Sequence, residues 1–141
     1  MLGALVRVNK NQAAYFRMKA RTASGLEIQA YLVGYVVSPT LTVIEEFHYP
    51  KKYAVQTTGE VRWWLDEYAL LKASAEAQGK RIVGDCHSHP DWDAVLSPSD
   101  YKSHIADGHR ITGLCSVMNG KTRLRFWIAE SALPVTIEYV P

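Results

Sequence analysis

The chain has 141 residues, of which 48% are hydrophobic, and a formal net charge of +2, values that predict one globular domain over residues 1–141. This much apolar material excludes intrinsic disorder, while the absence of any apolar run of ~18 residues excludes a transmembrane helix. Residues 1–6 are apolar but too few for the core of a signal peptide, so we expect a cytoplasmic protein with no membrane contact.

The distribution of charge and the cysteine content argue against a nucleic-acid partner and against a cysteine-based metal or redox site. Basic residues are scattered apart from a loose group near the N-terminus, which comprises Arg7, Lys10, Arg17, Lys19 and Arg21. A solvated helix face explains this group better than a nucleic-acid site does, so we expect no nucleic-acid partner. Cys86 and Cys115 lack the spacing of a zinc ribbon or a redox motif and are expected to be buried thiols. The sequence leaves open whether they lie close together or are bonded.

Strands and helices alternate along the first half of the chain. The pattern predicts a short strand over Leu5–Val8 and a helix over Asn11–Ser24, with Gly25 as its stop signal. Apolar, β-rich segments then predict three strands, at Ile28–Val37, Thr40–Phe47 and Tyr53–Gln56.

The clearest helical pattern comes next. Thr57 and Glu60 have the spacing of a capping box, and Gly79 is expected to close the helix. Trp63 is expected on the polar flank of this helix or at an interface. The apolar residues that recur at helical spacing are Val61, Trp64, Leu65, Tyr68, Leu71 and Ala75.

The last part of the chain is predicted to be mostly strand. Arg81–Cys86 has the composition of a buried strand, and Ser97 with Pro98 has the pattern that opens a short helix. Asn119-Gly120 is a hairpin signal between two apolar runs, and a final strand follows. These three strands are Ile111–Met118, Arg123–Ala129 and Val135–Val140. Strands mixed with helices predict an α/β domain with helices packed against a mixed sheet.

A polar group follows the Arg81–Cys86 strand. His87 and His89 are two residues apart, so their side chains project from the same face of a strand, and Asp85 shares that face. Pro90 is expected to end the strand and leave the histidine pair at its mouth. The carboxylate of Asp100 adds a third ligand candidate. Two imidazoles, one carboxylate and an open fourth position are typical of a catalytic zinc site.

The spacing of these residues resembles the signature of the JAMM (JAB/MPN) metalloprotease family. In that signature His-x-His is followed by ten residues and then Asp, as in His87, His89 and Asp100, with a Ser in the position of Ser97. The family also carries an upstream Glu in the pattern Glu-x-x-Gly-x-Leu-x-Gly, which residues 27–34 follow except that Ala30 replaces the first glycine. The resemblance implies a single-domain JAB/MPN fold, similar to cytidine deaminases, with a mixed β-sheet flanked by helices.

The resemblance also implies a role for each matching residue. His87, His89 and Asp100 would bind one Zn²⁺ per chain. Glu27 would act as general base and then general acid in amide hydrolysis, and Ser97 would donate a hydrogen bond to the developing oxyanion.

The implied activity is that of a deubiquitinase-like zinc metalloprotease or isopeptidase. Its substrate would be a peptide, or a ubiquitin-like protein or its conjugates cut after the C-terminal tail of the modifier. The alternative is a non-catalytic or complex-dependent MPN scaffold or binding module. The presence of every motif position disfavours a non-catalytic scaffold, and a member that is active only inside a complex stays open. A nucleobase deaminase would need His-x-Glu and Pro-Cys-x-x-Cys, and position 89 holds His instead of Glu.

Other polar residues compete for a place in the site. Glu45 and Glu46 precede the histidines but are interpreted as a solvated strand end. Asp91 and Asp93 are interpreted as loop residues beside the substrate channel. His104 is expected to be a half-exposed helix residue near the site.

Overall fold

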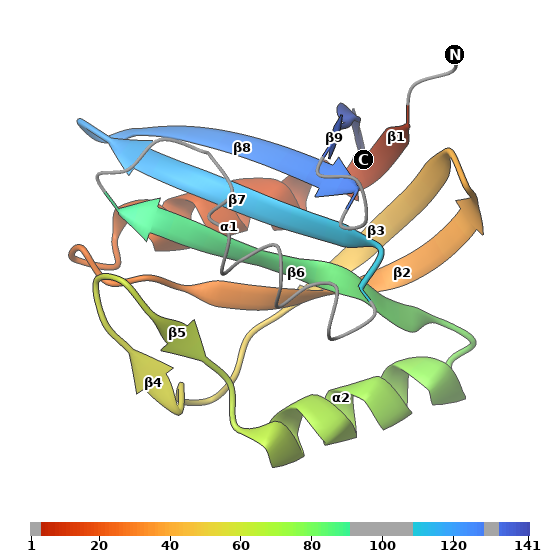
Figure 1. Cartoon of the computed structure of the whole chain (residues 1–141), viewed down its shortest axis with the longest axis horizontal. Coiled ribbons are helices and arrows are strands. Elements are labelled where there is room, and N and C mark those ends of the chain that lie inside the picture. The colour runs from red at the N-terminus through yellow and green to blue at the C-terminus, as the bar shows by residue number, and fades with distance from the viewer. Residues whose placement is uncertain (1–3, 91–108, 129–132) are drawn as a thin grey trace.

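The computed structural model describes residues 4–90, 109–128 and 133–141 (Figure 1). Within these ranges the chain forms two helices and an eight-stranded mixed sheet with the strand order β10-β1-β3-β2-β6-β7-β8-β9, and β4 pairs with β5 in a separate hairpin. The helices are α1 (Lys10–Arg21) and α2 (Leu65–Ala77). The strands are β1 (Leu5–Asn9), β2 (Gln29–Ser38), β3 (Leu41–His48), β4 (Val55–Gln56), β5 (Val61–Arg62), β6 (Arg81–Pro90), β7 (Ile111–Met118), β8 (Lys121–Ile128), β9 (Leu133–Pro134) and β10 (Thr136–Val140).

Strand β6 carries the two histidines through the middle of the sheet. It pairs antiparallel with β2 on one side and parallel with β7 on the other. Its residues from Ile82 to His89 are all buried, as expected for a central strand covered on both faces. The predicted strand over Arg81–Cys86 is therefore confirmed and extended, and Pro90 stands at its end.

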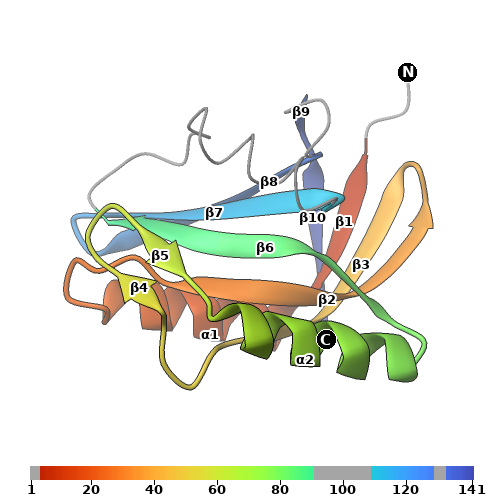
Figure 2. The same cartoon turned by 60° about the horizontal axis from the view of Figure 1, so that its bottom comes forward.

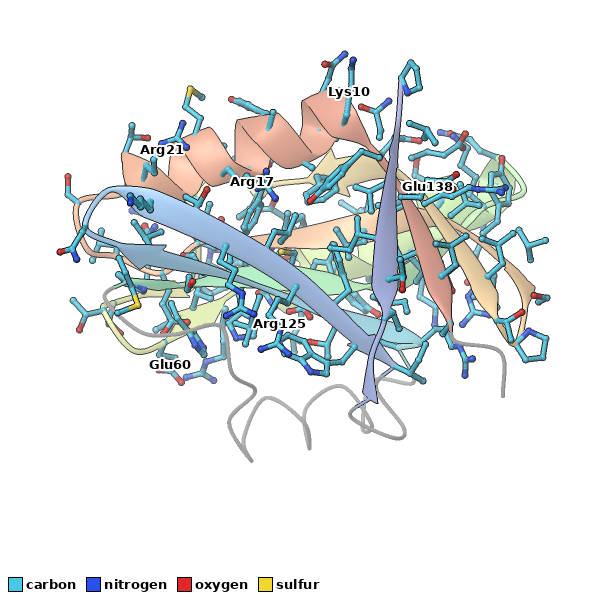
Figure 3. The ribbon with its side chains drawn as sticks, turned by 90° about the horizontal axis from the view of Figure 1, so that it is seen from above. Lys10, Arg17, Arg21, Glu60, Arg125 and Glu138 are labelled. Carbon is cyan, nitrogen blue, oxygen red and sulfur yellow. The ribbon has the colours of Figure 1, made fainter. Side chains whose placement is uncertain are left out.

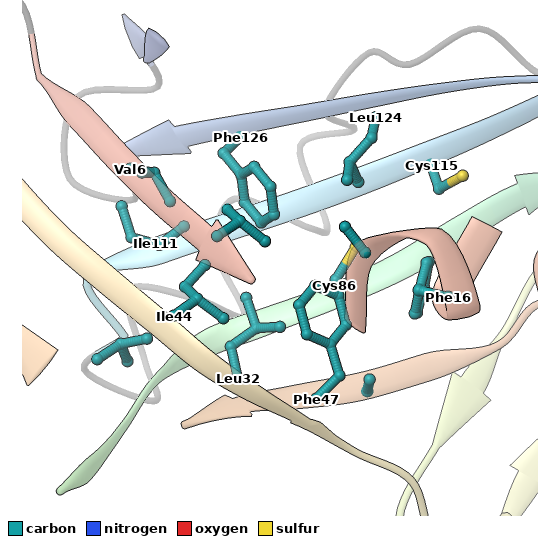
Figure 4. Packing of buried hydrophobic residues seen from close by; sticks show 14 of the residues in the cluster. Val6, Phe16, Leu32, Ile44, Phe47, Cys86, Ile111, Cys115, Leu124 and Phe126 are labelled. Carbon is teal, nitrogen blue, oxygen red and sulfur yellow. The ribbon is translucent and has the colours of Figure 1, made fainter. Parts of the chain in front are cut away.

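The main hydrophobic core lies between the sheet and α1. Phe16 of α1 points into a cluster of side chains from one face of the sheet (Figure 4). That cluster includes Leu32 of β2, Phe47 of β3, Cys86 of β6 and Phe126 of β8. Because strand side chains alternate, Cys86 faces this core, so His87 on the next position faces the other side.

Helix α2 contributes Ala75 to a second, smaller hydrophobic cluster, in which the other buried residues are Val33 of β2 and Ile82 of β6. Val33 follows the core residue Leu32, so this cluster lies on the opposite face of the sheet. Figure 2 shows α2 beside the β2–β6 part of the sheet. Ile82 stands near the start of β6, whereas the histidines stand near its end. The helix therefore covers a different part of this face from the one that carries the histidines.

The predicted start of the second helix is wrong. Thr57 and Glu60 form the turn between β4 and β5, where Oγ1 of Thr57 accepts hydrogen bonds from the backbone N–H of Gly59 (3.2 Å) and of Glu60 (2.9 Å). The helix begins only at Leu65, after Trp64, and Trp64 makes no side-chain capping bond. A Thr side chain can bond to N–H groups two and three residues ahead in a tight turn as well as at a helix start. The capping-box spacing does not distinguish the two.

The predicted apolar stripe of this helix is only partly buried. Ala75 is buried and Tyr68 and Leu71 pack against the second cluster, but Trp64 and Leu65 are exposed. Trp63 was expected on a polar flank or at an interface, yet its side chain is buried. Its ring and the Tyr31 ring form a T-shaped pair with centroids 4.8 Å apart. The helix starts later than the pattern suggested, so that Trp63 precedes it and Trp64 is its N-cap residue.

The basic group near the N-terminus lies on β1 and α1, with Arg7 on the strand and Lys10, Arg17 and Arg21 spread along the helix (Figure 3). Arg7 of β1 forms a 2.8 Å ion pair with Glu138 of β10, and Arg17 donates a 2.8 Å hydrogen bond to the Tyr139 hydroxyl. These basic residues thus attach the C-terminal strand to α1 and β1. The helix itself starts at Lys10, capped by the Asn9 side chain, and ends at Arg21, earlier than predicted.

The remaining strand predictions hold within small shifts of their ends. Asn119 and Gly120 have positive φ angles of 52° and 74° and join β7 to β8 in the predicted hairpin. The short helix predicted at Ser97 lies outside the described residues. No described helix has the length and apolarity to cross a membrane.

Candidate metal centre

The register between β2 and β6 brings the upstream motif to the histidines. Gln29 lies opposite His87, and Ala30 lies opposite Cys86 on the core face. Glu27 comes two residues before Gln29, just ahead of the first residue of β2. Ala30, which departs from the family pattern, is fully buried in the core cluster. A methyl group at this position therefore fits the sheet.

The backbone on both sides of Glu27 is fixed by hydrogen bonds. The Glu27 N–H donates to the Thr57 carbonyl at 2.8 Å, and the Gln56 side-chain amide donates to the Glu27 carbonyl at 3.1 Å. The next residue, Ile28, donates its N–H to Oγ of Ser88 at 2.9 Å and accepts from the Ser88 N–H at 2.9 Å. The β4–β5 hairpin and β6 thus hold the glutamate from two directions.

Glu27, His87 and His89 form a compact group. One ligand atom from each lies within 4.8 Å of the others, and the three residues are only 6–7% exposed. The two imidazole rings have centroids 5.1 Å apart and planes inclined by 66°. One carboxylate and two imidazoles at this spacing are a donor set that suits a divalent metal such as zinc.

The other residues assigned to the site by the motif are Ser97 and Asp100, and both lie outside the described residues. The same holds for Asp91, Asp93 and His104. Of the five residues assigned to the site, the described structure therefore brings together Glu27, His87 and His89.

The rival glutamates belong to a different part of the molecule. Lys80 forms ion pairs with Glu45 at 3.0 Å and with Glu46 at 2.8 Å, and His48 contacts Glu46 at 2.8 Å. The hydrogen bond from Lys80 lowers the pKa of Glu46, with a smaller contribution from His48, although burial opposes the shift. These contacts agree with the interpretation of a polar strand end.

One contribution to the site was missed in the sequence. Ser88, between the histidines, faces the core side, where its hydroxyl accepts the Ile28 N–H described above. A serine at an inward position of a buried strand is the signal that could have pointed to such a bond. His109 is also buried, and its Nε2 lies 3.2 Å from the Tyr68 hydroxyl rather than in the Glu27 group.

The two cysteines are buried, as predicted, and they are free, which the sequence left open. Burial raises the pKa of the Cys115 thiol to about 11 and that of Cys86 well above its usual range. Both thiols are therefore protonated near neutral pH. A protonated thiol is neither a metal ligand nor a nucleophile, so these cysteines belong to the packing of the core.

Comparison with solved structures supports the fold. A protein from Desulfitobacterium hafniense matches with a TM-score of 0.67 at 18% identity, over 96% of this chain and 92% of that one. A protein from Salinibacter ruber matches with a TM-score of 0.65 at 22% identity, over 95% and 91% of the two chains. A JAB1/MPN domain protein from Archaeoglobus fulgidus matches with a TM-score of 0.62 at 16% identity, over 96% and 99%.

No curated protein matches the sequence. The sequence profile of prokaryotic homologues of the JAB domain, in contrast, matches residues 10–129. This stretch runs from the start of α1 to the end of β8 and contains every motif residue named above. The chain therefore belongs to the family of prokaryotic JAB-domain homologues.

Proposed function

We propose that the protein is a zinc-dependent hydrolase of amide bonds, either isopeptide or peptide bonds. The observation that carries this proposal is the grouping of Glu27, His87 and His89 within 4.8 Å at the end of a buried strand. Family membership supports it, because the three residues occupy the positions of the JAMM motif.

The donor set fits the metal. His87 and His89 would hold the zinc ion, with Asp100 as the third ligand that the motif assigns. When bound, zinc supplies Lewis acidity that polarises a carbonyl and lowers the pKa of water to about 7. Glu27 lies near enough to the imidazoles to reach the same small volume.

Glu27 would move the protons of the reaction. Its carboxylate accepts a proton from the attacking water and returns it to the leaving amine, so the bond is cut without a covalent intermediate. The hydrogen bonds from Gln56 and to Thr57 keep the Glu27 backbone in place during both transfers. Ser97 is proposed to donate a hydrogen bond to the developing oxyanion.

The substrate is proposed to be an extended segment, such as a peptide or the C-terminal tail of a ubiquitin-like protein. Glu27, His87 and His89 are 6–7% exposed, so a folded surface would not reach them, whereas a single extended chain would. This favours cleavage in or after a tail.

The test is cleavage of ubiquitin-like fusions and of peptides with a fluorogenic C-terminal amine, with and without zinc. We expect hydrolysis that a chelator abolishes and that Glu27→Gln lowers by ~10²–10⁴-fold while zinc is retained. Glu60→Gln, the same change on the exposed β4–β5 turn, is the control and should leave the rate unchanged. Full activity of Glu27→Gln on a cleaved substrate would refute the role of Glu27. A zinc-loaded chain that cleaves none of the substrates would favour a scaffold function.

A further inference from the structure

Two polar residues lie beside His87 on the face of the sheet that carries the candidate metal centre. Gln29 of β2 stands opposite His87, and Asp85 of β6 stands opposite Tyr31. Residues opposite each other in an antiparallel pair share a face, and so do residues two apart on one strand. Gln29, Asp85 and His87 therefore form a triangle across two neighbouring strands.

Contacts connect these three side chains in order. The Gln29 side-chain amide donates a hydrogen bond to Oδ2 of Asp85, and the same oxygen lies 3.9 Å from Nδ1 of His87. The side chains of His87 and Asp85 are only 7% and 5% exposed. Burying a carboxylate costs free energy of folding unless neighbouring groups compensate its charge. A buried Asp85 beside a candidate metal ligand is therefore expected to have a role.

Gln29, whose side chain bonds to the carboxylate, is itself anchored through its backbone. The Tyr53 hydroxyl accepts the Gln29 N–H at 2.9 Å and donates to the Gln29 carbonyl at 2.8 Å. Tyr53 thus fixes both backbone groups of Gln29 from outside the sheet. Tyr53 therefore holds the backbone of Gln29, and the Gln29 side chain holds Asp85 beside His87.

We infer that Asp85, held by Gln29, is a positioning residue that sets the ring orientation and tautomer of His87. Its carboxylate favours a proton on Nδ1 of His87, which leaves the lone pair of Nε2 for a metal ion. Carboxylates that orient a ligating histidine in this way typically change metal affinity by 10–100-fold when removed. This inference deepens the proposed function and rests on it for the metal, but not for the tautomer.

The experiment measures both consequences in the full-length chain. Nitrogen NMR of the imidazoles, recorded without metal, should show His87 mainly protonated on Nδ1, and Asp85→Asn should reduce that population. Zinc affinity, measured by competition with a chromophoric chelator, should fall by 10–100-fold in Asp85→Asn. Gln29→Leu should cause a smaller loss of affinity, because the carboxylate stays but is no longer held, and it serves as a second variant if Asp85→Asn fails to fold.

Two control variants separate positioning from general destabilisation. Asp66→Asn makes the same chemical change in the exposed first turn of α2, and Val83→Ala removes a buried side chain from β6 without altering the carboxylate. Both should keep the tautomer and the zinc affinity of the parent chain. An unchanged tautomer and affinity in Asp85→Asn would overturn the inference alone. Failure of the parent chain to bind zinc would overturn the proposed function, while the metal-free tautomer would still decide the role of Asp85.

Discussion

Ser88 shows how one residue between two ligand candidates contributes without facing the metal position. Its neighbours His87 and His89 point to one face of β6, and its own side chain points to the other, where it accepts the Ile28 N–H at 2.9 Å. Ile28 directly follows Glu27. The His-Ser-His sequence therefore places the imidazoles and fixes the glutamate-bearing segment at the same time.

Replacing Ser88 with Ala is expected to weaken both the fold and the site. The buried Ile28 N–H loses its acceptor, which should lower the free energy of unfolding by about 1–3 kcal/mol. Because the Glu27 segment loses a tether, the hydrolysis rate should fall as well. Urea unfolding measures the first effect, with Ser38→Ala on the exposed end of β2 as the control. A stability equal to that of the parent chain would show that the hydroxyl does not hold the two strands.

At the scale of elements, the glycine that ends the upstream motif has a packing reason. A Cβ atom on Gly34 of β2 would collide with the carbonyl oxygen of Val43 on β3. This collision involves backbone, so no side-chain rotation relieves it. The register shift between Val33 and Gly34 lies at the same place. The last glycine of the motif is therefore required by the close approach of β2 to β3, whereas its first residue is Glu27 of the candidate site.

We predict that Gly34→Ala destabilises the chain by about 3 kcal/mol or more, because the two strands must separate locally. Gly59→Ala makes the same change in the β4–β5 turn, where an added Cβ would meet nothing within 4 Å. The control should change the free energy of unfolding little. Thermal unfolding of the two variants side by side measures the difference, and equal midpoints would contradict the packing argument.

The ion pairs of Lys80 connect the start of β6 to the end of β3 and should make stability depend on pH. The pKa of Glu46 is lowered from 4.5 in the fold, so its stabilising effect is present above that value and lost as pH falls through the lowered pKa. The pKa of Lys80 is raised from 10.5, so its contribution is lost only as pH rises through the raised value.

Lys80→Met should accordingly lower the unfolding midpoint slightly at neutral pH, and this difference should shrink in acid as Glu46 is protonated. Thermal scans of both chains from pH 2.5 to 8 test the expectation. Because these groups are partly solvated, the neutral-pH effect should amount to a few degrees at most. A midpoint difference that stays constant across this range would rule out the Glu46 pairing as its source.

For the whole molecule, the sequence predicted the two helices and the longer strands in their chain order, the buried β6 and the histidine pair. It did so because these features depend on local alternation and on a motif of fixed spacing. It missed the two-residue strands β5 and β9. It misplaced the start of α2, because a hydrogen bond from the Glu60 N–H to the Thr57 hydroxyl occurs in a hairpin turn as well as at the start of a helix. The bond from Ile28 to Ser88 and the bond from the Gln29 side chain to Asp85 depend on the pairing of β2 with β6, which joins residues 56 to 60 positions apart.

The measurement that tests the central claim most directly is the metal content of chain purified without chelator, determined by mass spectrometry. The account predicts about one zinc ion per chain, lost in both His89→Ala and Asp100→Ala while each variant stays folded. Zinc that persists in both variants, or a parent chain that holds no zinc even after reconstitution, would contradict a metal centre built on His87 and His89.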